Sequence, residues 1–79
     1  MRDQRKDWGR FELLLEQYLK KHNITHSRLL KAADLQYPQL KSYCNNEIQR
    51  ADLNVLARIC YALECNIEDI LRYVPPKDS

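Results

Sequence analysis

Four polar side chains recur on one side of a short segment in the middle of the chain: Gln39, Lys41, Ser42 and Asn45. Their chemistry suits hydrogen bonding to the edges of nucleic-acid bases. A glutamine amide can pair with adenine, and a lysine can donate to N7 and O6 of guanine. The ordinary alternative is a solvated polar surface. Only a rigid element that presents these side chains together would let them act as a set.

The sequence predicts two short helices separated by a break at residues 34–36. Before the break, Thr25 is a suitable N-cap, and Leu29 with Ala32 and Ala33 has the spacing of a buried helical stripe. After it, Pro38 is tolerated in a first helical turn, where backbone N–H groups have no partner within the helix. Apolar side chains then repeat with the helical period at Leu40, Tyr43 and Cys44. The segment from about 25 to 46 is therefore expected to be a helix-turn-helix.

These residues resemble the lambda-repressor/Cro-like, or Xre-type, helix-turn-helix family. The inward positions of that family's motif are filled by Leu29, Ala33, Leu35, Leu40 and Tyr43. The similarity continues downstream, where residues 53–71 resemble the family pattern LxxLAKALGVSLDEL. Two glycines of the pattern are replaced by Asp34 and Asn46, which can both adopt the left-handed conformation. The resemblance implies an all-α, compact five-helix DNA-binding domain.

The resemblance also implies two sets of contact residues. The candidates for base contacts are Gln36, Tyr37, Pro38, Gln39, Lys41 and Ser42. Tyrosine or proline at this place could contact a thymine methyl group. The candidates for contacts to the DNA backbone are Thr25, His26, Asn45 and Arg50. A helix N-terminus favours an anionic phosphate even without a basic side chain.

The remaining elements follow from apolar spacing and capping residues. A first helix is expected from Phe11 to His22, ended by Asn23, and a fourth is expected after Asp52. The inward stripe of this fourth helix is expected to comprise Leu53, Leu56, Ala57, Cys60 and Leu63, widened by Ile59. A short fifth helix is expected from Asn66 to residue 74, ended by two prolines. No strand-like alternation stands out.

Seventy-nine residues are enough for one domain. We expect a charged N-terminal arm at 1–10, the helix-turn-helix domain at 11–74 and a C-terminal tail at 75–79. The arm is either frayed or a contact to DNA, and Trp8 is expected to fold back onto the domain. With 13 basic and 11 acidic residues, the net charge of +2 would not by itself indicate a nucleic-acid partner.

The three cysteines lack paired CxxC spacing, so neither a disulfide framework nor a zinc module is indicated. His22, His26 and a cysteine could together form a metal site, but small buried thiols are the ordinary alternative, and no metal or cofactor is expected. No glycine-rich phosphate loop or nucleophile motif indicates an enzyme. Without an apolar run of about 18 residues or a signal peptide, the protein is expected to be cytoplasmic and not bound to membranes.

The predicted function is sequence-specific binding of double-stranded DNA by a small transcriptional regulator, a repressor, with the second motif helix in the major groove. A homodimer on DNA is expected because such domains commonly pair to read two half-sites. Its candidate interface residues are Leu71, Tyr73, Val74 and Trp8. Two alternatives stay open: a protein-interaction module that no longer reads DNA, and the antitoxin of a toxin–antitoxin pair.

Overall fold

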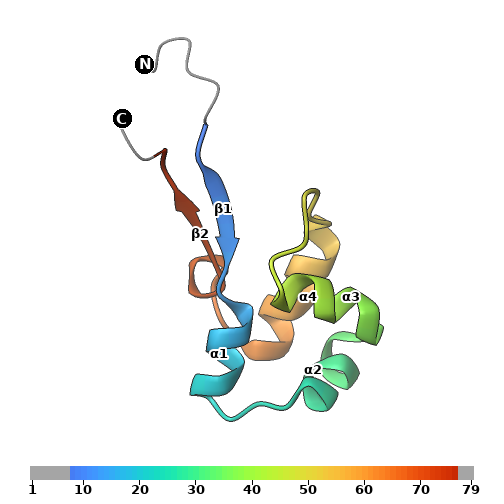
Figure 1. Cartoon of the computed structure of the whole chain (residues 1–79). Coiled ribbons are helices and arrows are strands. Elements are labelled where there is room, and N and C mark those ends of the chain that lie inside the picture. Colours follow the sequence, from blue (N-terminus) through green and yellow to red (C-terminus); the bar gives the residue numbers. More distant parts are fainter. Residues whose placement is uncertain (1–7, 77–79) are drawn as a thin grey trace.

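A computed structural model describes residues 8–76 as a group of helices from which a two-stranded ribbon extends (Figure 1). The elements in chain order are β1 (Arg10–Leu13), α1 (Leu15–Lys21), α2 (His26–Ala33), α3 (Tyr37–Cys44), α4 (Leu53–Leu63), the 3-10 turn η1 (Ile67–Asp69) and β2 (Leu71–Val74). Predictions that concern residues 1–7 and 77–79 lie outside the described residues.

The ribbon corrects the all-α, five-helix prediction. β1 and β2 pair antiparallel, with Arg10 opposite Val74 and Leu13 opposite Leu71. The first helix therefore begins at Leu15 rather than Phe11, and the expected fifth helix is replaced by the turn η1 and the strand β2. The described part of the chain contains four α-helices.

Cross-strand side-chain pairs explain why these two segments form strands. The rings of Phe11 and Tyr73 lie with centroids 5.5 Å apart, and Glu12 accepts a hydrogen bond from Arg72 at 2.8 Å. Aromatic and opposite-charge pairs are the kinds that stabilise neighbouring strands. They join residues about 60 positions apart, so no local pattern in the sequence reveals them.

The five inward positions of the helix-turn-helix are buried as predicted. Each is 7% exposed or less: Leu29, Ala33, Leu35, Leu40 and Tyr43. They share one core with residues from α1, α4 and the turn before β2, namely Leu15, Leu19, Val55, Leu56, Ile59 and Ile70. This core fixes α2 and α3 against the rest of the helices.

The predicted inward stripe of α4 is wrong at two of its positions, Leu53 and Ala57. Leu53 is 79% exposed and Ala57 is exposed, whereas Val55 is buried. Leu53 is the first residue of the helix, directly after Asp52, whose carboxylate accepts from the Asn54 N–H at 2.8 Å. The face that α4 buries is thus centred on Val55, Leu56 and Ile59.

Three of the turns adopt the left-handed conformation that their residue types favour. Asn23, Asp34 and Asn46 have φ angles of 56°, 57° and 59°.

The side chain of Trp8 does not fold back onto the domain as predicted, because 77% of it is exposed. Its backbone carbonyl instead accepts a hydrogen bond from the Tyr73 hydroxyl at 2.6 Å.

Among the described residues, no helix is both long and apolar enough to span a bilayer.

Candidate nucleic-acid interface

The outer face of α3 is a polar stripe. Leu40 and Tyr43 point into the core. The opposite face carries residues at i, i+3, i+4 and i+7, which lie in line on a helix; these are Pro38, Lys41, Ser42 and Asn45. Pro38, Lys41 and Asn45 are exposed and Ser42 is half-buried. These four residues form the outer stripe of α3.

The other predicted base contacts flank the outer stripe. Gln36 is exposed and is the N-cap of α3, and the Tyr37 side chain is 54% exposed. Gln39 is half-buried at the edge of the outer stripe. The structure thus brings all six candidates onto one helix and its N-terminus, and their contacts to bases remain a prediction.

Hydrogen bonds at the turn before α3 and from its inner face connect the helix-turn-helix to α4 and to the residue that caps it. At the turn before it, the backbone carbonyl of Asp34 accepts from Arg58 of α4 at 3.0 Å, and the Leu35 N–H donates to the Leu30 carbonyl at 3.0 Å. On its inner face, the Tyr43 hydroxyl accepts from the Asp52 N–H at 3.0 Å. Together with the buried side chains of Leu40 and Tyr43, these bonds hold α3 against the rest of the fold with its outer stripe exposed.

The four predicted backbone contacts come from three segments: the start of α2, the end of α3 and the loop before α4. Thr25 caps α2, where its hydroxyl oxygen accepts from the Arg28 N–H at 3.2 Å. Asn45 is exposed at the end of α3, and Arg50 is exposed in the loop before α4. His26 begins α2 and is already paired with Glu16, at 3.0 Å between Nε2 and Oε1. Contacts of these residues to phosphates remain predictions.

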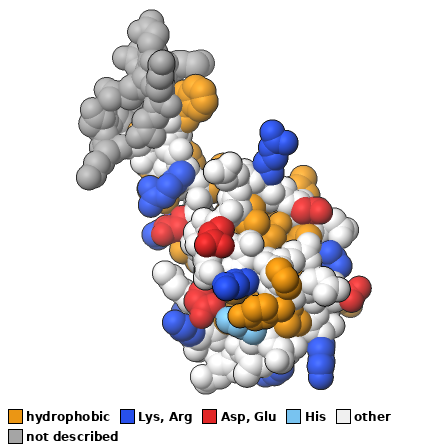
Figure 2. Space-filling view, turned by 45° about the vertical axis from the view of Figure 1, so that its right-hand side comes forward, with side chains coloured by type: hydrophobic (Ala, Val, Ile, Leu, Met, Phe, Trp, Pro, Cys, Tyr) orange, Lys and Arg blue, Asp and Glu red, His pale blue; other side chains and the backbone are white. Residues whose placement is uncertain are grey.

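On the face shown in Figure 2, the basic side chains of residues 8–76 do not form a single patch. Figure 2 shows blue basic groups distributed over the visible face, with acidic and apolar groups between them. Lys41 on α3 and the exposed Arg28 and Lys31 on α2 supply positive charge close to the helix-turn-helix. Such a surface gives a weaker general attraction to DNA than a concentrated basic face.

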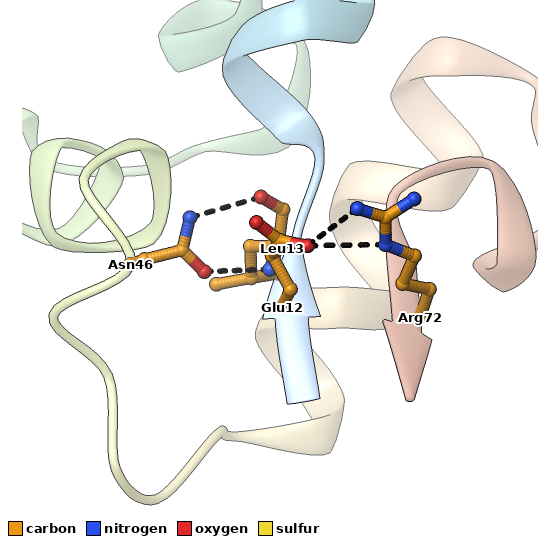
Figure 3. Close-up of polar contacts among 4 residues, drawn as sticks. All are labelled: Glu12, Leu13, Asn46 and Arg72. Atoms are coloured by element: carbon orange, nitrogen blue, oxygen red, sulfur yellow. Dashed lines mark hydrogen bonds and ion pairs between the residues drawn. The ribbon is translucent and has the colours of Figure 1, made fainter. Parts of the chain in front are cut away.

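Sequence reasoning missed two groups of contacts near this surface. In the first, the side chain of Asn46 hydrogen-bonds to the backbone of Leu13 in β1 (Figure 3). Asn46 was expected only to take the place of a turn glycine. The only signal in the sequence is an asparagine where the family pattern has a glycine, and that signal says nothing about the strand that Asn46 contacts.

The second group joins three helices. Cys44 at the end of α3 has its Sγ 4.0 Å from Nε2 of His26, beside Glu16 of α1. Hydrogen bonding from His26 holds the pKa of the Glu16 carboxyl below its usual value. Burial, followed by contact with Glu16, raises the pKa of the Cys44 thiol to about 12. His22 is not part of this group, and its ring lies against that of Tyr18, with ring centroids 4.2 Å apart.

α2 and α3 form a helix-turn-helix, and the outer stripe of α3, its second helix, lies at the protein surface. These features define the class of helix-turn-helix proteins. Residues 15–76 match the sequence profile of the family described as Cro/C1-type HTH DNA-binding domain. The chain therefore belongs to this family, which confirms the resemblance seen in the sequence and supports binding of double-stranded DNA and a role in regulating transcription. A search of curated proteins gave no match. A search of solved structures gave none either.

Proposed function

We propose that the protein represses transcription by binding a specific operator with α3 in the major groove. The observation that carries this proposal is the outer stripe, a polar surface on a helix whose opposite face is fixed in the core. A helix fits the major groove, which is about 12 Å wide, and only there do base edges distinguish all four base pairs. An operator occupied in this way would be closed to other proteins.

Within this proposal, Lys41 and Gln39 carry the strongest base discrimination. Lysine donates to guanine and the amide of glutamine pairs with adenine, and each good pair discriminates by about 1–3 kcal/mol. Gln36, Tyr37, Pro38 and Ser42 complete the base-facing surface. Tyr37 and Pro38 offer apolar surface suited to a thymine methyl group.

Contacts to phosphates would set the register of α3 in the groove. The N-terminus of α2 offers unpaired N–H groups beside Thr25 and His26, and an anionic phosphate is favoured there. Asn45 and Arg50 lie at the other end of α3 and in the following loop. Phosphate contacts on both sides of a recognition helix fix its position without adding sequence information.

The test is selection of bound duplexes from a random-sequence pool, followed by affinity measurements at two salt concentrations. We expect one enriched sequence to bind more tightly than a random duplex, with affinity falling as salt rises. The proposal fails if the folded protein enriches no sequence at low salt. Transcription from a promoter that carries the selected site should then fall when the protein is present.

We also propose a homodimer on DNA, with the ribbon as its contact surface. Three aromatic side chains there are more than half exposed: Trp8, Phe11 and Tyr73, with 77%, 67% and 51% exposed. Half-sites would lie about 34 Å apart, one turn of the duplex. Sedimentation of the protein with a selected site should show two chains per duplex, and the paired substitutions Phe11→Ser and Tyr73→Ser should give one.

A specific observation favours a second candidate, a protein-interaction module. Tyr37 is 54% exposed at the end of α3 that would enter the groove first, and the net charge is only +2. Exposed tyrosines are enriched where proteins bind each other. This candidate would be supported by a folded protein that selects no DNA but binds a protein partner, with binding lost in Tyr37→Ala.

A further inference from the structure

Three side chains that can ligate a metal ion converge from three different helices. They are Glu16 in the first turn of α1, His26 at the start of α2 and Cys44 at the end of α3. One oxygen, one nitrogen and one sulfur atom from them all lie within 4.8 Å of one another. None of the predicted DNA contacts other than His26 belongs to this cluster.

The arrangement is not that of a nucleophilic triad. In a triad, the nucleophile and the carboxylate contact opposite nitrogens of the imidazole ring, so that a proton can pass across it. Here Oε1 of Glu16, at 3.0 Å, and Sγ of Cys44, at 4.0 Å, both lie next to the same Nε2 of His26. Three donor atoms that lie this close together, from three different helices, are placed so that they could share one cation.

The distances suit a tetrahedral zinc site. With bonds of about 2.0–2.1 Å to nitrogen and oxygen and about 2.3 Å to sulfur, the nitrogen would lie about 3.4 Å from the oxygen and about 3.6 Å from the sulfur. The observed separation of nitrogen and oxygen, 3.0 Å, is slightly shorter than the value for zinc. The observed separation of nitrogen and sulfur, 4.0 Å, is slightly longer. Shifts of about 0.4 Å, within reach of side-chain rotation, would bring the three atoms into place.

We propose that Glu16, His26 and Cys44 bind one zinc ion, with water in the fourth position. Imidazole and thiolate ligands favour zinc over magnesium or calcium, which prefer oxygen donors alone. On binding, the Cys44 thiol gives its proton to solvent, and Nε2 of His26 gives up the proton that it donates to Glu16, so that the neutral ring keeps a proton on Nδ1 alone. Bonds from zinc to the sulfur, the nitrogen and the Glu16 oxygen then form as water molecules leave the ion. No electron is transferred.

The surroundings permit an ion to enter. The side chains of His26 and Glu16 are 43% and 35% exposed, so the cluster opens to solvent. Lys20 lies 3.8 Å from the other carboxylate oxygen of Glu16 and is itself 77% exposed, so it can turn away. A bound ion would tie α1 to the start of α2 and the end of α3, beside the core against which Cys44 packs, and would thus stiffen the helix-turn-helix.

The test uses Co²⁺ as a spectroscopic probe in the full chain under reducing conditions, followed by competition with Zn²⁺. We expect one equivalent of Co²⁺ to give a sulfur-to-cobalt charge-transfer band together with the intense visible bands of tetrahedral cobalt. Zn²⁺ should displace it. Cys44→Ser should abolish the charge-transfer band, and His26→Gln or Glu16→Gln should weaken binding by at least about tenfold.

Matched controls come from the same chain. Cys60→Ser, Cys65→Ser and His22→Gln remove the other thiols and the other imidazole, and they should bind Co²⁺ like the parent protein. Circular dichroism without metal checks that each variant is folded, and Glu16→Gln keeps a hydrogen-bond acceptor for His26. A band that is absent, that survives Cys44→Ser or that disappears in a control variant would overturn the proposal. The measurement requires no DNA, so its outcome is independent of operator binding.

Discussion

Asn46 pairs with both backbone groups of Leu13. Its Oδ1 accepts from the Leu13 N–H at 2.6 Å, and its Nδ2 donates to the Leu13 carbonyl at 3.0 Å (Figure 3). One side chain therefore reproduces the double exchange that an antiparallel neighbour would make at the edge of β1. Asn46 follows Asn45, the C-cap of α3. The contact therefore links the ribbon to the helix that carries the outer stripe.

The first prediction concerns this contact. Asn46→Gly keeps the positive φ and removes both hydrogen bonds, which should lower the free energy of unfolding by about 1–2 kcal/mol. Asn46→Ala loses the same bonds and adds left-handed strain, so it should cost about 1 kcal/mol more. Urea unfolding of the two variants measures this difference. Equal stability of both variants and the parent would show that the contact with Leu13 contributes nothing.

The second prediction concerns the inner face of α3. Leu40 is fully buried, and Leu40→Ala should destabilise the protein by about 2–5 kcal/mol. Leu53 is 79% exposed, so Leu53→Ala is the matched control and should change stability by no more than about 0.5 kcal/mol. Thermal unfolding compares the pair. Similar effects at both positions would contradict the assigned faces of α3 and α4.

The third prediction distinguishes base contacts on α3. Lys41→Ala and Gln39→Ala should weaken the selected site by about 1–3 kcal/mol for each good pair that is lost, and a random duplex by less. Stability should change by about 0.5 kcal/mol or less because both side chains lie on the outer side of α3. Titrations with both duplexes give the specificity ratio. If this ratio stays constant in both variants, α3 does not read bases through these residues.

The fourth prediction concerns phosphate contacts. Arg50→Ala should weaken selected and random duplexes equally and lower the salt slope by about one unit, because one charged contact is lost. Asn45→Ala and His26→Ala should also weaken both duplexes equally. Asn45 is uncharged, so its loss should leave the slope nearly unchanged. Affinities over a series of salt concentrations provide the slopes, and an unchanged slope in Arg50→Ala would remove Arg50 from the interface.

The fifth prediction concerns thiol reactivity. Burial, with a further contribution from Cys60, raises the pKa of the Cys65 thiol from 9.0 to about 11. The thiolate is the reactive form, so its fraction near neutral pH should be about 100-fold lower than for an unshifted thiol. Alkylation by iodoacetamide, followed residue by residue with mass spectrometry, should therefore be slow at Cys65 and accelerate in denaturant. Equal rates in the folded and unfolded chain would contradict this.

The sequence by itself determined the helix-turn-helix. The apolar positions from Leu29 to Tyr43 repeat with the helical period, and Thr25 and Asp34 carry the signals for a helix start and a left-handed turn. These signals act between residues three or four positions apart, so they are readable without any knowledge of the fold. The same local rules also placed the start of the fourth helix after Asp52, although they assigned Leu53 to the wrong face.

Only the tertiary structure decided the ribbon, the Asn46 contact and the cluster of Glu16, His26 and Cys44. β1 and β2 are four residues each, too short for alternation to distinguish them from a turn of helix. Their pairing depends on partners about 60 positions away. The cluster likewise requires α1, α2 and α3 to pack before its three donor atoms meet. Packing of the shared core sets these distances, and a single sequence carries no local signal for them.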